Sequence, residues 1–238
     1  MKDGDKPWFQ RQWAKVTSKL YGRVLDFGCG TELECACLAT LPAVESVCAY
    51  DISLDIEKTK GRLSNYGLAD RIDLIRDPAA LDSLSGVFDS VFSWNVTEHL
   101  SCPLAEFDRV FRCLKKGGLW SFRHHPYYSF IDGHHLLNEH YLRRASPRWR
   151  NCLTEGPHLL DPDSFVRDNR EVLRLAGLNM MTLFQLRCFL VMAGFEIDLW
   201  DLTSKEKGAV PVARGVSEQD ALSVCLHVVA RKGEEVCH

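Results

Sequence analysis

Strand-like and helix-like segments alternate along the first half of the chain, and this alternation constrains its fold more than any other feature. Short runs of branched and aromatic residues, which predict buried strands, occur at 22–28, 44–51, 71–77, 88–95 and 118–124. Helical periodicity occupies 32–41, 53–67 and 103–118 between them. Strands separated by helices pair in parallel through right-handed crossovers. The pattern therefore predicts an α/β fold with a doubly wound, mostly parallel sheet and helices on both faces.

The ends of the predicted helices carry local signals. In the second helix, Ser53 is placed to cap the first turn, Asp55 lies within that turn, and Gly67 follows the last turn. The third helix is expected to continue through Lys115, which suits the negative end of the helix dipole, to a cap at Gly117.

The regular pattern returns near residue 182 after a long interruption. Thr182 and Gln185 have the spacing of a capping box before a helix at 183–194. Two further strand-like runs follow at 195–202 and 221–232. Because no helix separates these runs, we expect them to pair as an antiparallel hairpin at the sheet edge.

The interruption itself, at about 125–178, is too long for an ordinary loop. We interpret it as a partly helical insertion between the fifth and sixth strands that caps the substrate. The chain would then consist of an N-terminal lid or helical segment at 1–21 and one domain at 22–238.

Composition argues against several functional classes. The formal charge of -3 does not favour a nucleic-acid partner, and no apolar run reaches the length that crosses a bilayer. The N-terminus lacks the apolar core of a signal peptide. Most of the ten cysteines lie in apolar stretches and no CxxC pair occurs, so we expect a reduced, cytoplasmic protein.

Five histidines occur within residues 124–140, which raises the question of a metal site. Neither HxxxH nor HExxH spacing is present, and adjacent histidines on a strand point to opposite faces. We therefore expect no bound metal and interpret these residues as part of a polar substrate pocket.

Two glycines lie where the first strand meets its helix, in the stretch VLDFGCGTELE. Gly28 and Gly30 lack Cβ atoms, so a ligand could approach the main chain there. Leu33 replaces the third glycine of a dinucleotide-binding loop, and no Walker lysine follows. Asp26 before the glycines and Asp51 after the second strand suit a ribose diol or a cationic ligand.

In order, the segments VLDFGCGT, AYDIS, IRDPAAL, FDSVFSWNVTEHL and FRCLKKGGLWSF resemble the successive motifs of class I S-adenosylmethionine-dependent methyltransferases of the small-molecule type. The likeness covers roughly 20–124 and 180–232. It implies a Rossmann-like, seven-stranded sheet whose last strand is antiparallel, in agreement with the predicted hairpin.

The resemblance also implies how the cofactor S-adenosyl-L-methionine is bound. The glycine backbone would contact its methionine portion, Asp26 its amino group and Asp51 its ribose, while Ile52 would pack against the adenine. The full set of implied cofactor contacts is Asp26, Gly28, Gly30, Asp51, Ile52, Asp77, Pro78, Ser93, Trp94 and Asn95. Glu32 departs from the family, which usually has a glycine there.

Methyl transfer requires an oriented acceptor and, for a hydroxyl, a base. Candidate bases are His99, for which a structural role is the alternative, and His124 and His125, which end the fifth strand and could equally bond to the backbone of the insertion. The candidate substrate-binding residues are Tyr127, Tyr128, His134 and His135.

The predicted function is thus methyl transfer to a small molecule, at an oxygen of a sugar or natural product, with nitrogen and carbon acceptors left open. A non-catalytic relative that binds the cofactor or a partner as a scaffold is the alternative. A nicotinamide-dependent reductase is disfavoured by Leu33 and by the antiparallel end of the sheet.

Overall fold

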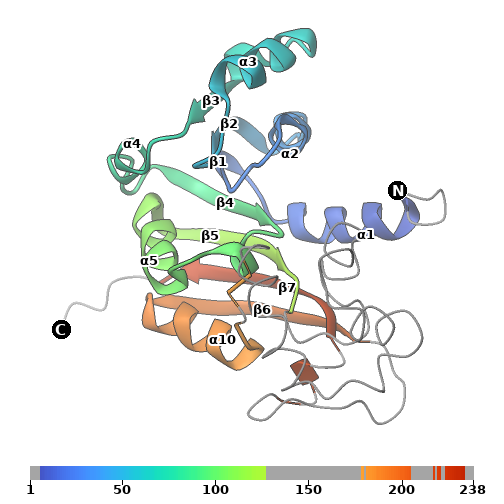
Figure 1. Ribbon diagram of the computed structural model, residues 1–238, viewed down its shortest axis with the longest axis vertical. Coiled ribbons are helices and arrows are strands. Elements are labelled where there is room, and N and C mark those ends of the chain that lie inside the picture. The colour runs from blue at the N-terminus through green and yellow to red at the C-terminus, as the bar shows by residue number, and fades with distance from the viewer. Residues whose placement is uncertain are drawn as a thin grey trace, which may run out of the picture.

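The computed structural model describes residues 6–126, 178–179, 181–204, 217, 219–220 and 223–233. Within this part of the chain, seven strands form one sheet in the order β3-β2-β1-β4-β5-β7-β6 (Figure 1). The strands are β1 (Gly22–Phe27), β2 (Val44–Tyr50), β3 (Ile72–Ile75), β4 (Phe88–Trp94), β5 (Leu114–His124), β6 (Phe195–Ser204) and β7 (Ser223–Lys232).

The sheet confirms the predicted topology. Strands β1 to β5 pair in parallel, whereas β7 lies antiparallel between β5 and β6. The chain proceeds from β1 outward to β3 and then returns to β4 on the other side of β1. This reversal between β1 and β4 opens a crevice at the carboxyl ends of the strands, where doubly wound sheets bind their ligands.

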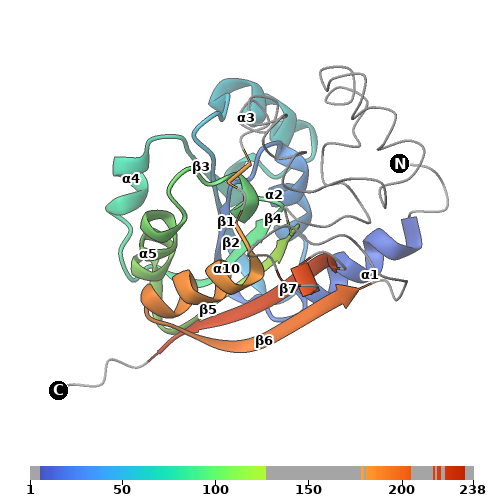
Figure 2. The same ribbon diagram turned by 60° about the horizontal axis from the view of Figure 1, so that its bottom comes forward.

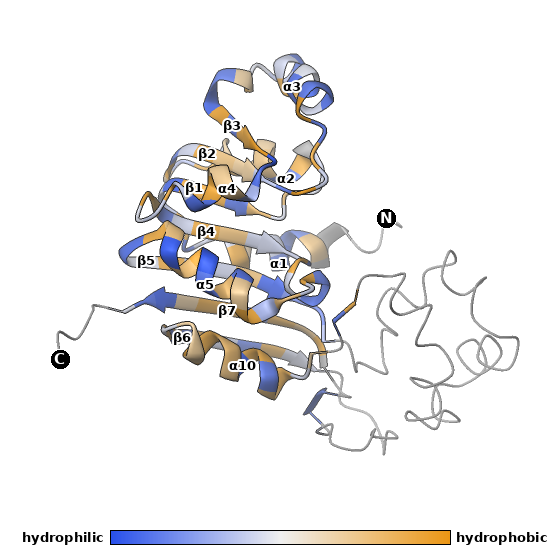
Figure 3. Cartoon of the chain, turned by 60° about the vertical axis from the view of Figure 1, so that its left-hand side comes forward, coloured by the Kyte–Doolittle hydropathy of each residue, from blue (hydrophilic) through white to orange (hydrophobic). Residues whose placement is uncertain are grey.

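Helices cover both faces of the sheet, as expected for this fold (Figures 2 and 3). Helices α4, α5 and α10 contribute buried side chains to one core cluster, and α1, α2 and α3 contribute to the other. Their bounds are α1 (Lys6–Thr17), α2 (Glu32–Leu38), α3 (Ile56–Asn65), α4 (Pro78–Asp82), α5 (Pro103–Cys113) and α10 (Leu183–Met192), with 3₁₀ turns η2 (Ala69–Arg71) and η3 (Thr97–His99).

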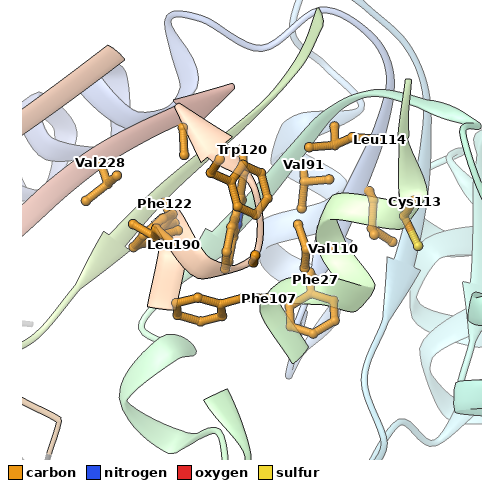
Figure 4. Packing of buried hydrophobic residues seen from close by; sticks show 14 of the residues in the cluster. Phe27, Val91, Phe107, Val110, Cys113, Leu114, Trp120, Phe122, Leu190 and Val228 are labelled. Carbon is orange, nitrogen blue, oxygen red and sulfur yellow. The ribbon is translucent and has the colours of Figure 1, made fainter. Parts of the chain in front are cut away.

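Trp120 of β5 is the centre of the first core cluster (Figure 4). Its ring is fully buried, and its centroid lies 5.1 Å from that of Phe107 on α5 and 5.7 Å from that of Phe195 on β6. The indole N–H donates to the Ser93 hydroxyl at 3.1 Å, so the polar end of the ring is satisfied inside the core. This packing fixes β4 and β5, which carry much of the candidate site.

The helix-end predictions were partly right. Thr182 and Gln185 form the expected capping box, and Gly67 follows α3. Asp55, not Ser53, is the N-cap of α3: its carboxylate accepts the backbone N–H of Lys58 at 3.1 Å. The Ser53 hydroxyl instead donates to the Asp51 carboxylate at 2.6 Å, which draws it away from the helix.

The predicted end of helix 103–118 was wrong. Helix α5 ends at Cys113, and Leu114 already pairs with Phe88 as the first residue of β5. Leu114 is fully buried, so tertiary packing favours the strand over another helical turn. Lys115 forms an ion pair with Asp89, at 2.7 Å, instead of interacting with a helix end. Helix α4, between β3 and β4, was not predicted.

Most of the expected insertion at 125–178 lies outside the described residues. In the whole part of the chain that the structure describes, no helix is long and apolar enough to cross a membrane.

Candidate active site

A hollow of about 380 Å³ opens at the carboxyl ends of β1 and β4, where the strand order reverses. Its volume is within the range of small-molecule and cofactor sites, about 300–1,000 Å³. We call it the acidic hollow. Its lining residues are Asp26, Gly28, Cys29, Gly30, Thr31, Glu34, Asp51, Trp94, Asn95, Val96 and His99.

The glycine turn forms the floor of the acidic hollow. Gly28 has a φ of +82°, and a Cβ there would lie 2.5 Å from the methyl groups of Val96, so only glycine fits. Gly30 has a φ of +53°, and no atom lies within 4 Å of where its Cβ would be. The main chain at Gly30 is therefore open to a ligand, as the sequence predicts.

Asp51 holds this turn from the end of β2. One carboxylate oxygen accepts the backbone N–H of Gly30 at 3.0 Å, and the other accepts the N–H and hydroxyl of Ser53 at 2.8 and 2.6 Å. A carboxylate offers about four acceptor sites. These three hydrogen bonds fix the orientation of Asp51 and leave capacity for about one further donor, such as a ribose hydroxyl.

Asp26, at the end of β1, is only 1% exposed. Among the described residues, no donor reaches its Oδ2 atom. Burial first, and then the negative charges of Glu34 and Asp51, raise the pKa of the Asp26 carboxyl well above its ordinary value. Three neighbouring carboxylic acids therefore make the acidic hollow a site that favours a cationic ligand.

Cys29 lies between the two glycines and is nearly fully buried. Burial, assisted by the nearby Asp26 carboxyl, raises the pKa of its thiol. This environment disfavours the thiolate, which is the nucleophilic form of cysteine. Among the described residues, no cluster of three or more histidines, cysteines and acids could hold a metal ion.

Trp94 and Asn95 form the wall of the hollow above β4. The Trp94 ring packs against Trp13 of α1, with centroids 5.5 Å apart. On its other side, the Arg123 guanidinium lies 4.8 Å from the ring centroid and donates to the Asn95 side chain at 2.8 Å. Ser93 belongs to the core instead, where its buried hydroxyl accepts from Trp120.

The three candidate bases have different surroundings. His99, in η3, lines the acidic hollow. His124 is fully buried, with its Nδ1 atom 2.8 Å from the Thr97 hydroxyl and 3.7 Å from the Glu98 carboxylate. His125 is half-buried and is not among the described lining residues. His99 is thus the histidine that the described structure brings to the hollow.

A second hollow, of about 570 Å³, is lined by Ile52, which follows Asp51 directly in the chain. We call it the Ile52 hollow. The Ile52 side chain is 68% exposed there, and Asp77 caps α4 by accepting the N–H of Ala79 at 3.0 Å. The residues lining it are Ile52, Ile56, Leu74, Ile75, Arg76, Asp77, Pro78 and Ala80. The predicted adenine contacts are therefore together, next to Asp51.

The sequence analysis missed some of the residues that line the acidic hollow. It also named candidate residues that the structure does not describe. Glu34 was missed, although its position three residues after Thr31 at a helix start is a signal for a first-turn acid. The Glu32 side chain and the predicted substrate residues lie outside the described residues; those substrate residues are Tyr127, Tyr128, His134 and His135.

A family model described as "Methyltransferase domain" matches residues 6–198. The chain belongs to this methyltransferase family. The match includes strands β1 to β5, the first residues of β6 and all the residues that line the two hollows, which confirms the resemblance read from the motifs. No curated protein matches the chain.

Solved structures with the same fold are distant in sequence. An S-adenosylmethionine-dependent methyltransferase from Mesorhizobium loti is 20% identical, with a TM-score of 0.56 over 92% of this chain and 97% of that one. A geranyl diphosphate methyltransferase in complex with SAM is 11% identical, with a TM-score of 0.62 over 93% and 84%. The [4+2]-cyclase SpnF is 17% identical, with a TM-score of 0.59 over 95% and 80%. These similarities establish the shared fold.

Proposed function

We propose that this methyltransferase uses S-adenosyl-L-methionine and transfers its methyl group to a small molecule. The observation that carries the proposal is the acidic hollow: Asp26, Glu34 and Asp51 border it beside the open main chain of Gly30. S-adenosylmethionine has an ammonium group, a sulfonium centre and a ribose diol, and carboxylates suit all three. A nicotinamide dinucleotide would instead bring an anionic pyrophosphate to these acids, which argues against a reductase.

The two hollows fit different parts of this cofactor. In the acidic hollow, Asp26 would hold the ammonium group, the main chain at Gly28 and Gly30 would contact the methionine portion, and Asp51 would accept a ribose hydroxyl. Trp94 and Asn95 would border the methyl group. In the Ile52 hollow, the adenine would lie against the residues Ile52, Asp77 and Pro78. Ser93 is given no contact, because its hydroxyl is bonded inside the core.

The cofactor, when bound, supplies an activated methyl group, and its sulfur is a neutral thioether after that group has been transferred. The chain has to orient the acceptor behind that methyl group and exclude water, and orientation of this kind can contribute about 7–11 kcal/mol. We assign the role of base to His99, because it lines the hollow. Its imidazole accepts the proton that the acceptor hydroxyl loses as the new carbon–oxygen bond forms. General bases contribute about 10²–10⁴-fold to the rate.

The acceptor we propose is a hydroxyl oxygen of a sugar or natural product. The support for it is the histidine in the hollow wall, since transfer to a neutral hydroxyl requires removal of a proton. An amine acceptor that is already deprotonated would need no base for the transfer step. Loss of the base should therefore slow transfer to a hydroxyl more than transfer to such an amine.

Calorimetry with S-adenosylmethionine, S-adenosylhomocysteine and NADH tests the cofactor. Binding of the first two and not of NADH is the expected result, and binding of NADH alone would overturn the proposal. Release of S-adenosylhomocysteine is then measured with panels of hydroxyl, amine and carbon acceptors. Cofactor binding without turnover on any panel would replace the proposed reaction with a binding or scaffold role, as in the alternative predicted from sequence.

A further inference from the structure

Four hydrogen bonds hold the backbone of the turn that carries His99. Two residues separate this turn, η3, from the end of β4. The backbone N–H of His99 donates to the carbonyl of Val96 at 2.8 Å. The carbonyls of Thr97, Glu98 and Leu100 all accept hydrogen bonds from one residue far away in the chain, Asn179.

Asn179 makes this contact with both its side chain and its backbone. Its Nδ2 atom donates to the carbonyls of Thr97 and Leu100 at 2.7 and 3.0 Å, and its backbone N–H donates to the carbonyl of Glu98 at 2.9 Å. Its own Oδ1 accepts the backbone N–H of Met181 at 3.1 Å. Because Met181 is buried in the core next to α10, Asn179 connects the turn to a rigid part of the fold.

The opposite side of the turn is bonded to the end of β5. The Thr97 hydroxyl lies 2.8 Å from Nδ1 of His124, and the Glu98 carboxylate lies 3.7 Å from the same atom. All three side chains are at most 1% exposed. The two residues before His99 thus point into the interior, and His99 itself is left to line the acidic hollow.

We propose that Asn179 and His124 are positioning residues, which clamp the η3 turn from both sides and thereby hold His99 at the acceptor. The inference rests on the proposed function, because it takes His99 as the base. Under this inference, His124 influences the reaction through the Thr97 hydroxyl, because the His124 ring itself is enclosed by the protein. A displacement of about 1 Å in a reacting group can cost about 10²-fold in rate, so a clamp of this kind matters for turnover more than for cofactor binding.

The principal variant is Asn179→Asp. It keeps the shape of the side chain but replaces the Nδ2 donor with an oxygen that faces two carbonyl oxygens. Thr97→Val, which removes the hydroxyl next to His124, tests the other side of the clamp and serves as a second variant if Asn179→Asp fails to fold. Asn65→Asp is the matched control, because Asn65 is exposed at the end of α3 and the charge change is the same.

Each full-length variant is compared with the wild type in three measurements. These are kcat with the best acceptor, the Kd for S-adenosylhomocysteine, and the histidine ring resonances in NMR spectra, with His99 assigned by its own substitution. Asn179→Asp and Thr97→Val should each lower kcat roughly 10- to 100-fold and shift the His99 resonances. Both should leave the Kd within about threefold, and the control should change none of these values appreciably.

The decisive comparison repeats Asn179→Asp in a His99→Ala background. If Asn179 acts through His99, the second substitution should lower kcat by less than about threefold there. An equal loss in both backgrounds, or an unchanged kcat in Asn179→Asp, would overturn the inference while leaving the methyltransferase proposal standing. Failure of the wild type to bind S-adenosylhomocysteine would instead overturn the proposed function. The NMR comparison would still show whether Asn179 fixes the His99 turn.

Discussion

Substitution of Asp26 by asparagine should change stability and cofactor affinity in opposite directions. Asparagine has the same shape but carries no charge. In the ligand-free protein, the Asp26 carboxyl is buried and its Oδ2 atom has no hydrogen-bond donor among the described residues, so ionisation is unfavourable. Removal of this group should stabilise the fold, and each 1 kcal/mol gained raises Tm by about 2–4 °C in a domain of this size.

Affinity for S-adenosylmethionine should fall at the same time. If Asp26 accepts from the ligand's ammonium group, Asp26→Asn removes a charged hydrogen bond worth about 1.5–3 kcal/mol, or roughly 10- to 150-fold in Kd. Thermal unfolding of the free protein and calorimetry with the cofactor measure the two effects separately. The control is Asp73→Asn, at a largely exposed position on β3, which should change neither Tm nor Kd appreciably.

The pH dependence of binding provides an independent check on Asp26. Burial, followed by the charges of Glu34 and Asp51, raises the pKa of this carboxyl, so the proton is retained to higher pH than in the unfolded chain. A cationic ligand favours the ionised form, and affinity should therefore increase as pH rises through that pKa. The asparagine variant should lose this dependence. An unchanged Kd together with a raised Tm would refute the role of Asp26 in binding.

Four further substitutions test the turn, the ribose contact and the fold. Asp51→Asn should weaken binding of S-adenosylhomocysteine by about 1–3 kcal/mol in calorimetry, because the amide accepts fewer hydrogen bonds than the carboxylate; unchanged affinity would contradict the ribose assignment. In urea unfolding, Gly28→Ala should cost about 2 kcal/mol or more, since the added Cβ would lie 2.5 Å from Val96 at a φ of +82°. Gly30→Ala meets no atom within 4 Å and should cost only about 1–2 kcal/mol of backbone strain, so equal losses would contradict the steric argument. Burial lowers the pKa of His227 to about 4, below the ordinary value of about 6.5 for histidine. The stability that the neutral imidazole contributes is therefore fully present above about pH 6.5 and is lost as the pH falls towards 4. His227→Gln should therefore reduce the loss of unfolding free energy across that interval by roughly 3 kcal/mol, and an identical pH profile would show that His227 does not titrate there.

The sequence predicts best those features that depend on neighbouring residues. The capping box of Thr182 and Gln185 and the glycine turn after β1 need only residues a few positions apart, and both are present as expected. Helix α4 could have been found in the same way, because Asp77 followed by Pro78 is a helix-start signal and Asp77 is indeed its cap. The parallel pairing of β1 to β5 followed from alternation alone, since the crossover rule leaves few alternatives.

The two helix-end predictions that failed have different causes. Lys115 and Gly117 follow a helix and have the composition of a helix end, yet Leu114 is required in the core beside Phe88, and this contact turns the segment into a strand. Ser53 has the right residue type for a cap, but the Asp51 carboxylate binds its hydroxyl more closely. A tertiary contact in the first case and a neighbouring side chain in the second outweighed a local preference worth about 1 kcal/mol or less.

The same distinction separates the two halves of the active site. The cofactor half consists of local motifs at strand ends, and the sequence alone could therefore indicate Asp26, Gly30 and Asp51. The proposed acceptor half contains His99, whose turn is held by Asn179 across 82 residues, a contact that no local pattern reveals. A fold shared with methyltransferases and with a [4+2]-cyclase fixes neither the acceptor nor the reaction. Under the proposed function, the acceptor chemistry depends on how such long-range contacts orient the side chains around His99, and variants of the clamp should affect turnover before they affect cofactor binding.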